Sequence, residues 1–108
     1  MASSKEYLDF VLEQLSELCD VSYRPMMGEY IIYYKGKIIG GIYDNRFLIK
    51  PTKSVRRLMP DAPLECPYDG AKEMILVIRV EDKAFLKTVF NTIFDELPEP
   101  KKKDSRIL

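Results

Sequence analysis

The chain of 108 residues contains no histidine and no tryptophan, and Cys19 and Cys66 are its only cysteines. Without histidine it lacks the side chain best suited to proton transfer near neutral pH. The two cysteines are far apart and outside any Cys-x-x-Cys spacing, which excludes a zinc knuckle or redox motif of the usual kind. We expect two buried free thiols, because unpaired cysteine commonly acts as a small core residue.

A phosphate-binding glycine loop is also missing from the sequence, and we expect neither a cofactor nor a metal. Catalysis would need Cys19 or Cys66 beside an activating lysine or arginine, or a carboxylate or lysine acting as general base. No such arrangement can be assembled from the sequence. We therefore expect a protein that is not an enzyme.

Long apolar runs are absent as well, and no segment approaches the roughly 18 apolar residues of a membrane span. The first residues lack the apolar stretch of a secretion signal, so we expect a cytoplasmic protein with no membrane contact. Hydrophobic residues make up 46% and charged residues 31%, which is typical of a folded domain. We predict one domain over residues 1–100 and a basic, flexible tail over 101–108.

Charge is divided along the chain although the formal net charge is zero. Residues 5–20 carry a net charge of −4, whereas residues 35–57 carry +6. This division could favour an anionic partner or the acidic face of a second copy, but it is more often that of an ordinary solvated surface.

Three helices are predicted. Ser3 and Glu6 have the spacing of a capping box, so the first helix should begin near Ser4 and end near Asp20. A short helix should run from Thr52 or Ser54 to residue 59. The last should begin at residues 81–82 and end before Pro98. Apolar residues recur at helical spacing in the first and last helices, which predicts that each covers a core.

The segments between these helices are predicted to form strands. Polar turns at Lys35-Gly36-Lys37 and Asp44-Asn45 join β-prone segments and predict an antiparallel meander. We expect a further, central strand in which Met74 to Ile78 are buried. The predicted strands cover residues 29–34, 38–43, 46–50 and 73–80, and residues 21–27 should form a short first strand or an extended lead-in. The fold class is therefore α+β, with helices packed on an antiparallel sheet.

The segment from Arg24 to Tyr30 enters this meander. Gly28 predicts a backbone need, either a positive φ, a bulge or close approach of another strand. Met26, Met27, Gly28 and Tyr30 are also candidates for the wall of a contact groove, because flexible thioethers adapt to a partner.

Basic residues of the meander and the short helix form a second candidate surface. Lys50, Lys53, Arg56 and Arg57 could bind a carboxylate or phosphate. Exposed tyrosines beside cations could also stack on nucleic-acid bases. The tyrosines concerned are Tyr30, Tyr33, Tyr34 and Tyr43, and the neighbouring cations are Lys35, Lys37, Arg46 and Lys50. The near-neutral charge balance argues against strong DNA binding.

The run Met26-Met27-Gly28-Glu29-Tyr30-Ile31-Ile32-Tyr33 resembles the TfoX (Sxy) N-terminal domain family, as do Gly36, Gly40, Phe47-Leu48-Ile49-Lys50 and Pro67-Tyr68. Family members commonly carry Met-Phe-Gly-Gly-Tyr-Gly in the first run, from which Met27, Glu29 and Ile31 depart. The resemblance implies a two-layer α+β domain similar to the secretion chaperones. It also implies a link to regulators of natural competence, which act with the cyclic-AMP receptor protein and usually carry a second, helical domain. We expect a stand-alone N-terminal domain without that C-terminal domain.

Two functional hypotheses follow from the residues and the resemblance. The first is a non-catalytic regulatory or adaptor domain acting by protein–protein contact, linked to transcription or competence regulation. Its partner would be a transcription regulator, another protein or a second copy in a homodimer. The alternative is a binder of nucleic acid or of a small anionic ligand through the basic meander.

Overall fold

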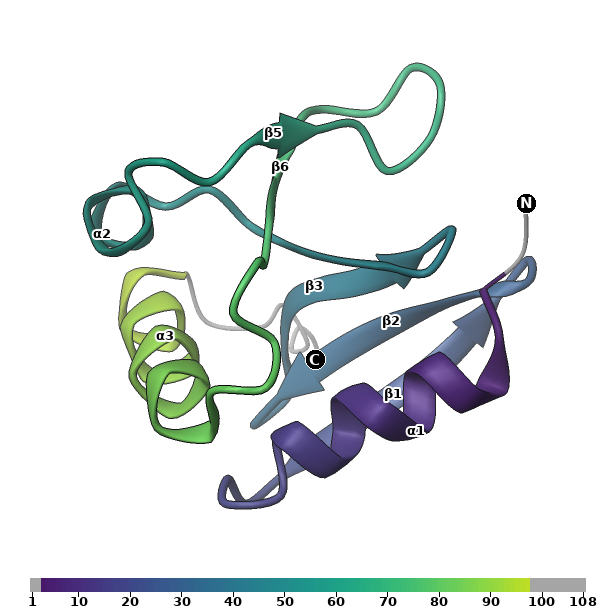
Figure 1. Ribbon diagram of the computed structural model, residues 1–108, viewed down its shortest axis with the longest axis horizontal. Coiled ribbons are helices and arrows are strands. Elements are labelled where there is room, and N and C mark those ends of the chain that lie inside the picture. Colours follow the sequence, from purple (N-terminus) through teal and green to yellow (C-terminus); the bar gives the residue numbers. More distant parts are fainter. Residues whose placement is uncertain (1–2, 98–108) are drawn as a thin grey trace, which may run out of the picture.

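A computed structural model describes residues 3–97, which form one six-stranded antiparallel sheet and three helices (Figure 1). The strand order is β1-β2-β3-β4-β6-β5, so that β1 and β5 are the sheet edges. This arrangement confirms the predicted α+β class. The elements are α1 (Lys5–Gln14), β1 (Val21–Met26), β2 (Glu29–Tyr34), β3 (Lys37–Tyr43), β4 (Arg46–Ile49), α2 (Lys53–Leu58), β5 (Leu64–Glu65), β6 (Met74–Leu76) and α3 (Lys83–Glu96).

The first four strands form the predicted meander, and a two-residue turn closes each hairpin. Both residues of every turn have positive φ, as type I′ turns require. In the first turn, Met27 has φ of 53° and Gly28 of 85°, which confirms the predicted backbone role of Gly28. The other two turns are Lys35-Gly36 and Asp44-Asn45.

A bulge in β3 decides which side chains face the core. Ile32 pairs with Gly40 while Tyr33 pairs with Ile38, so β3 has one extra residue at Ile39. Ile39 and Ile42 both lie in the core although they are three positions apart, because an extra residue reverses the alternation of faces. Ile38 and Tyr43 consequently lie on the opposite face.

One face of the sheet, called here the inner face, packs against α1 and α3. Leu8 of α1, Phe90 of α3 and Phe47 of β4 are fully buried in the same cluster. Figure 1 shows α1 running beside β1 and β2. The last helix, α3, lies at the left of this view near the C-terminal end of β2, where Phe90 contacts Tyr34. The other face, called the outer face, carries no helix of the described chain.

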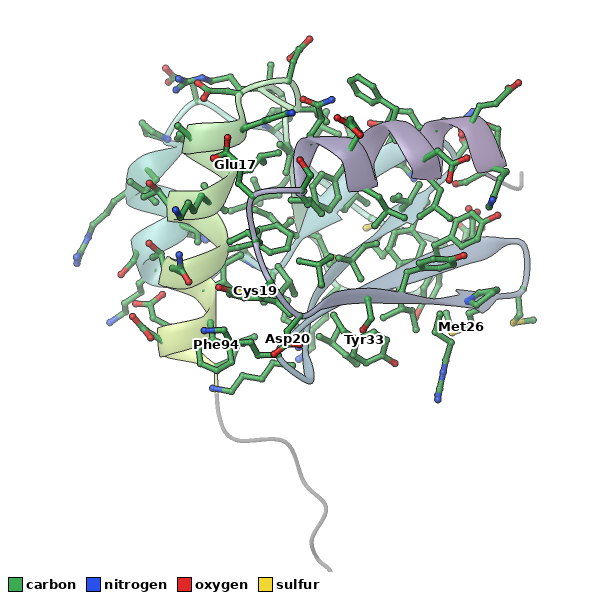
Figure 2. The ribbon with its side chains drawn as sticks, turned by 90° about the horizontal axis from the view of Figure 1, so that it is seen from below. Glu17, Cys19, Asp20, Met26, Tyr33 and Phe94 are labelled. Carbon is green, nitrogen blue, oxygen red and sulfur yellow. The ribbon has the colours of Figure 1, made fainter. Side chains whose placement is uncertain are left out.

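The first helix begins near Ser4 as predicted, but its capping contacts and its end differ from the prediction. Ser4, not Ser3, is the N-cap, and its Oγ accepts a hydrogen bond of 3.1 Å from the Tyr7 amide. The Ser3 hydroxyl instead donates to Glu29 and accepts from the Asn45 amide, so the predicted capping box is wrong. The helix ends at Gln14 rather than near Asp20. Figure 2 shows Glu17, Cys19 and Asp20 along the loop that follows it.

The strand predicted over 73–80 is shorter and less central than expected. β6 covers Met74–Leu76 and lies between β4 and the two-residue edge strand β5. Val77 still donates its amide to the Phe47 carbonyl, but the chain then turns toward α3. Ile78 is therefore 59% exposed, which corrects the prediction that it is buried.

Residues 98–108, which include the predicted basic tail, lie outside the described part of the chain. No helix within residues 3–97 has the length and apolar character needed to cross a bilayer.

Candidate functional site: a groove on the outer sheet face

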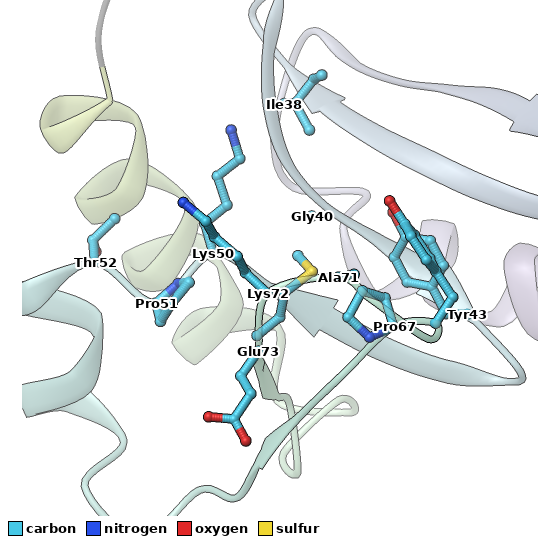
Figure 3. Close-up of a pocket in the computed structure, with 12 residues that line it drawn as sticks. Ile38, Gly40, Tyr43, Lys50, Pro51, Thr52, Pro67, Ala71, Lys72 and Glu73 are labelled. Carbon is cyan, nitrogen blue, oxygen red and sulfur yellow. The ribbon is translucent and has the colours of Figure 1, made fainter.

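The loop between β5 and β6, residues 66–73, folds over the outer face and encloses a groove of about 450 Å³ (Figure 3). We call it the outer groove. Its floor is formed by β3 and the end of β4, and the loop supplies the opposite wall. The lining residues are Ile38, Gly40, Tyr43, Lys50, Pro51, Thr52, Pro67, Tyr68, Ala71, Lys72, Glu73 and Met74.

Two tyrosines form one end of the outer groove. The rings of Tyr43 and Tyr68 lie 6.1 Å apart between centroids and are inclined by 59°, a tilted contact that favours packing. Tyr43 is buried, which raises the pKa of its hydroxyl, whereas Tyr68 is 59% exposed. The exposed part of Tyr68 is therefore available to another molecule.

Gly41 makes room for the Tyr43 ring. A Cβ at Gly41 would lie 2.7 Å from Cε2 of Tyr43 and 2.6 Å from the Tyr30 carbonyl oxygen, both too close for any side chain. The Tyr43 ring therefore covers the bare backbone of its own strand, as aromatic residues do beside strand glycines.

Arg46 fixes the start of the loop. Its guanidinium donates to the Glu65 carboxylate at 2.7 Å and to the Cys66 carbonyl at 3.3 Å, and its Nε donates to the Tyr43 carbonyl at 3.1 Å. A planar guanidinium is suited to such simultaneous contacts. One side chain therefore holds the loop against the strand that carries Tyr43.

Lys50 and Lys72 mark the other end of the outer groove. In the view of Figure 3 both side chains extend away from Tyr43, while the Glu73 carboxylate points in the opposite direction from the two ammonium groups. Partial burial lowers the pKa of Lys50, because it disfavours the charged form. Within residues 3–97, neither lysine forms an ion pair with a carboxylate.

The candidate contact residues predicted from the sequence fall into two separate groups. Met26, Met27 and Gly28 lie at or beside the β1–β2 turn, where Met27 is 96% exposed. Tyr30 is half-buried and packs edge-on against Tyr23 at 5.8 Å.

The second group lies near the outer groove. Lys50 lines the groove, and Lys53, Arg56 and Arg57 are exposed on α2. Figure 1 places α2 and the β1–β2 turn at opposite ends of the molecule, so the predicted residues do not form one continuous surface.

The meander has fewer basic side chains available for contact than the sequence predicted. Lys37 was predicted in an exposed turn, but it belongs to β3, is only 7% exposed and donates from Nζ to the Phe94 and Leu97 carbonyls. Arg46 is committed to Glu65. Of the other two meander cations considered for nucleic-acid contact, Lys35 lies over the Tyr34 and Phe94 rings, 5.2 and 5.5 Å from their centroids, and Lys50 lines the outer groove.

Both cysteines are exposed, so the prediction of buried thiols is wrong. Cys19 lies in the loop after α1 and Cys66 directly after β5, where neither side chain reaches the inner face. Cys66 precedes Pro67 of the outer groove, but neither cysteine lines it. Across the described residues, no group of three or more histidine, cysteine or acidic side chains could hold a metal ion.

Several residues of the outer groove were not singled out from the sequence. Ile38 was assigned to a strand without a face, and Lys72 and Met74 were not connected with Lys50. Tyr68 was named only in the Pro67-Tyr68 motif of the resemblance, although an aromatic residue between Pro67 and Asp69 was a usable signal of an exposed contact.

The fold and the groove thus define a small α+β domain with an antiparallel sheet and a ligand-sized hollow on its open face. The family model for the TfoX N-terminal domain matches residues 13–88. The chain belongs to this family, which confirms the resemblance.

A similar protein is known from Spirochaeta aurantia. It is described as an uncharacterized 12.7 kDa protein in the trpE 5′ region and is 31% identical over 107 residues. The match covers 98% of this chain and 93% of the relative, so the two proteins are alike in length. No solved structure matches the chain.

Proposed function

We propose that this chain is a non-catalytic regulatory domain that works by protein–protein contact, with the outer groove as its contact site. The TfoX N-terminal domain family is linked to competence regulation, which supports a regulatory role. The observation that carries the proposal is the apolar, partly open outer groove. Tyr68 is 59% exposed and Ile38 40% exposed at its rim.

Such a groove suits the anchoring side chains of a protein partner. Protein interfaces concentrate their binding energy in a few large side chains that enter preformed pockets. The outer groove offers aromatic, proline and methionine surface to such an anchor, with polar residues at one end. Exposed apolar surface rimmed by polar groups is also typical of interaction sites.

Electrostatics favour a protein partner over nucleic acid. Residues 3–97 carry 13 lysines and arginines against 15 aspartates and glutamates. A nucleic-acid surface normally needs a dense basic footprint. Lys37 and Arg46 donate hydrogen bonds to the Phe94 carbonyl and the Glu65 carboxylate, so these two cations are not available to phosphate groups.

The partner that we propose is a different protein, such as a transcription regulator. The acidic helix α1 packs on the inner face, whereas the outer groove opens on the opposite one. A contact between these two surfaces in neighbouring copies would be head-to-tail and would not close a two-fold dimer. The expected cytoplasmic location stays a prediction.

Affinity capture from the native cell tests this function. Wild-type protein would be compared with the double variant Tyr68→Ala, Ile38→Ser and with Phe10→Ala, which removes an exposed aromatic side chain from α1. We expect the same partner with wild type and Phe10→Ala, and its loss with the double variant. A partner retained by the folded double variant would reject the outer groove as contact site.

A further inference from the structure

We propose that the outer groove selects a peptide segment in which a large apolar side chain lies next to a carboxylate. This inference rests on the proposed function, because it names the chemistry of the partner at the same site. The apolar side chain would occupy the space between Tyr68 and Met74, and the carboxylate would lie at the end formed by Lys50 and Lys72.

The groove has distinct apolar and basic ends. Tyr43, Pro67 and Tyr68 provide a wall without formal charge, whereas Lys50 and Lys72 extend toward the opposite end. An occupant that matches both ends must carry an apolar group and a negative charge a short distance apart. Complementary potentials of this kind give an interface its register and its specificity.

The basic end has no intramolecular counter-charge among the described residues. Glu73 lines the groove, but Figure 3 shows its carboxylate directed away from the two lysines. Glu96 is engaged by Ser54, whose amide and hydroxyl donate to its two carboxylate oxygens at 3.2 and 2.6 Å. Partial burial of an ammonium group without a negatively charged partner is unfavourable. A carboxylate of another molecule would therefore stabilise the charged form of these lysines.

Tyr43 is poorly placed to stack on a nucleic-acid base. Its ring covers Gly41 on one side and contacts Tyr68 on the other. A stacking platform needs a free aromatic face, together with cations that follow a phosphate backbone. The groove offers two lysines at one end, which fits a single carboxylate better than a strand of phosphates.

The test is an NMR titration of ¹⁵N-labelled protein with a defined peptide. The probe is a hexapeptide, blocked at both ends, in which two glutamates flank a central phenylalanine–leucine pair and one glycine stands at each end. A matched peptide replaces both glutamates by glutamine. We expect the acidic peptide to shift the amide resonances of Ile38, Tyr68 and Lys72, and to bind about 5-fold more tightly than its neutral counterpart.

Protein variants supply the matched control. The double variant Lys50→Gln, Lys72→Gln should bind both peptides with about equal affinity, since its preference depends on the two ammonium groups. Lys87→Gln, which changes an exposed lysine of α3 outside the groove, should retain the about 5-fold preference. Thermal unfolding of each variant would show that it folds.

Three other outcomes would contradict the inference, and each would reject a different part of it. Equal binding of the two peptides to wild-type protein would reject the carboxylate requirement but leave protein contact at the groove intact. No shift with either peptide would reject this peptide chemistry, whereas the proposed function fails only if capture is independent of Tyr68 and Ile38. Stronger shifts with single-stranded oligothymidylate than with the acidic peptide would assign the groove to nucleic acid.

Discussion

The ammonium group of Lys37 lies 4.0 Å from the centroid of the Phe94 ring and donates a 3.0 Å hydrogen bond to the Phe94 carbonyl. A second 3.0 Å hydrogen bond goes to the Leu97 carbonyl, just beyond the end of α3. The last carbonyls of a helix lack intrahelical partners and carry partial negative charge. A lysine on the first position of β3 therefore ties the sheet to the C-terminus of the last helix.

Replacing Lys37 by methionine should lower the free energy of unfolding by about 2 kcal/mol, because two carbonyls lose a charged donor. The apolar stem is kept, so the loss reports on the ammonium group. Urea unfolding followed by circular dichroism measures it. Lys87→Met, at an exposed position of α3, should change stability by less than about 0.5 kcal/mol. Equal effects of the two changes would contradict the capping role.

Gly40 is expected to tolerate no side chain. A Cβ there would overlap the Leu48 carbonyl oxygen and lie 2.7 Å from the Ile49 Cα, and both atoms belong to the backbone of β4. Gly40→Ala should therefore cost about 3 kcal/mol, since the strands must separate.

Gly70→Ala is the comparison for Gly40→Ala. Nothing lies within 4 Å of the added Cβ at Gly70, but its φ of +87° disfavours alanine. This change should cost about 1 kcal/mol. Denaturant midpoints of the two variants check the order, and a smaller loss for Gly40→Ala would be inconsistent with the strand packing described.

Glu96 should make the domain less stable in acid. Hydrogen bonds from Ser54 and Thr52 lower the pKa of its carboxyl below the ordinary value of 4.5. The unfolded chain then binds the proton more readily, so the stability that the carboxylate contributes is present above about pH 4.5 and is lost as pH falls through the folded pKa. Thermal unfolding at pH 7 and at about pH 3 should differ less for Glu96→Gln than for wild type. An unchanged pH dependence in the variant would exclude this contribution.

Lys50 should titrate below the ordinary lysine value of 10.5, because partial burial disfavours its charged form. A ¹³C NMR titration of the lysine side chains, with Lys50→Gln used to assign the resonance, measures the pKa directly. Addition of the acidic hexapeptide should raise it, since a nearby carboxylate stabilises the ammonium. A free-state pKa at or above 10.5 would show that the groove does not desolvate this lysine.

Local sequence signals predicted much of this fold. The turns at Lys35-Gly36 and Asp44-Asn45 were predicted and fix two hairpins, because few residue pairs accept positive φ at both positions, whereas at Met27-Gly28 only the backbone need of Gly28 was predicted. Helical periodicity likewise placed α3 correctly. The early end of α1 was not predicted, because Leu15 and Leu18 continue the apolar spacing into a loop that still packs on the core.

The candidate site was only partly predictable for a different reason. Lys50 was identified from charge, but the outer groove depends on the loop 66–73 folding back over β3. The contacts of Arg46 with Glu65 and of Tyr43 with Tyr68 that hold this loop join residues 19 and 25 positions apart, and no local pattern reveals them. The burial of Lys37 could not be predicted for the same reason, because its partners, the Phe94 and Leu97 carbonyls, lie far along the chain.

Site-specific photo-crosslinking in the native cell tests the central claim most directly. A benzoylphenylalanine at position 68 would report on the outer groove, and the same group at position 10 would report on α1. We expect one protein crosslinked from position 68 but not from position 10, with the product reduced when Ile38→Ser is added. A partner crosslinked from position 10 and not from position 68 would contradict this claim.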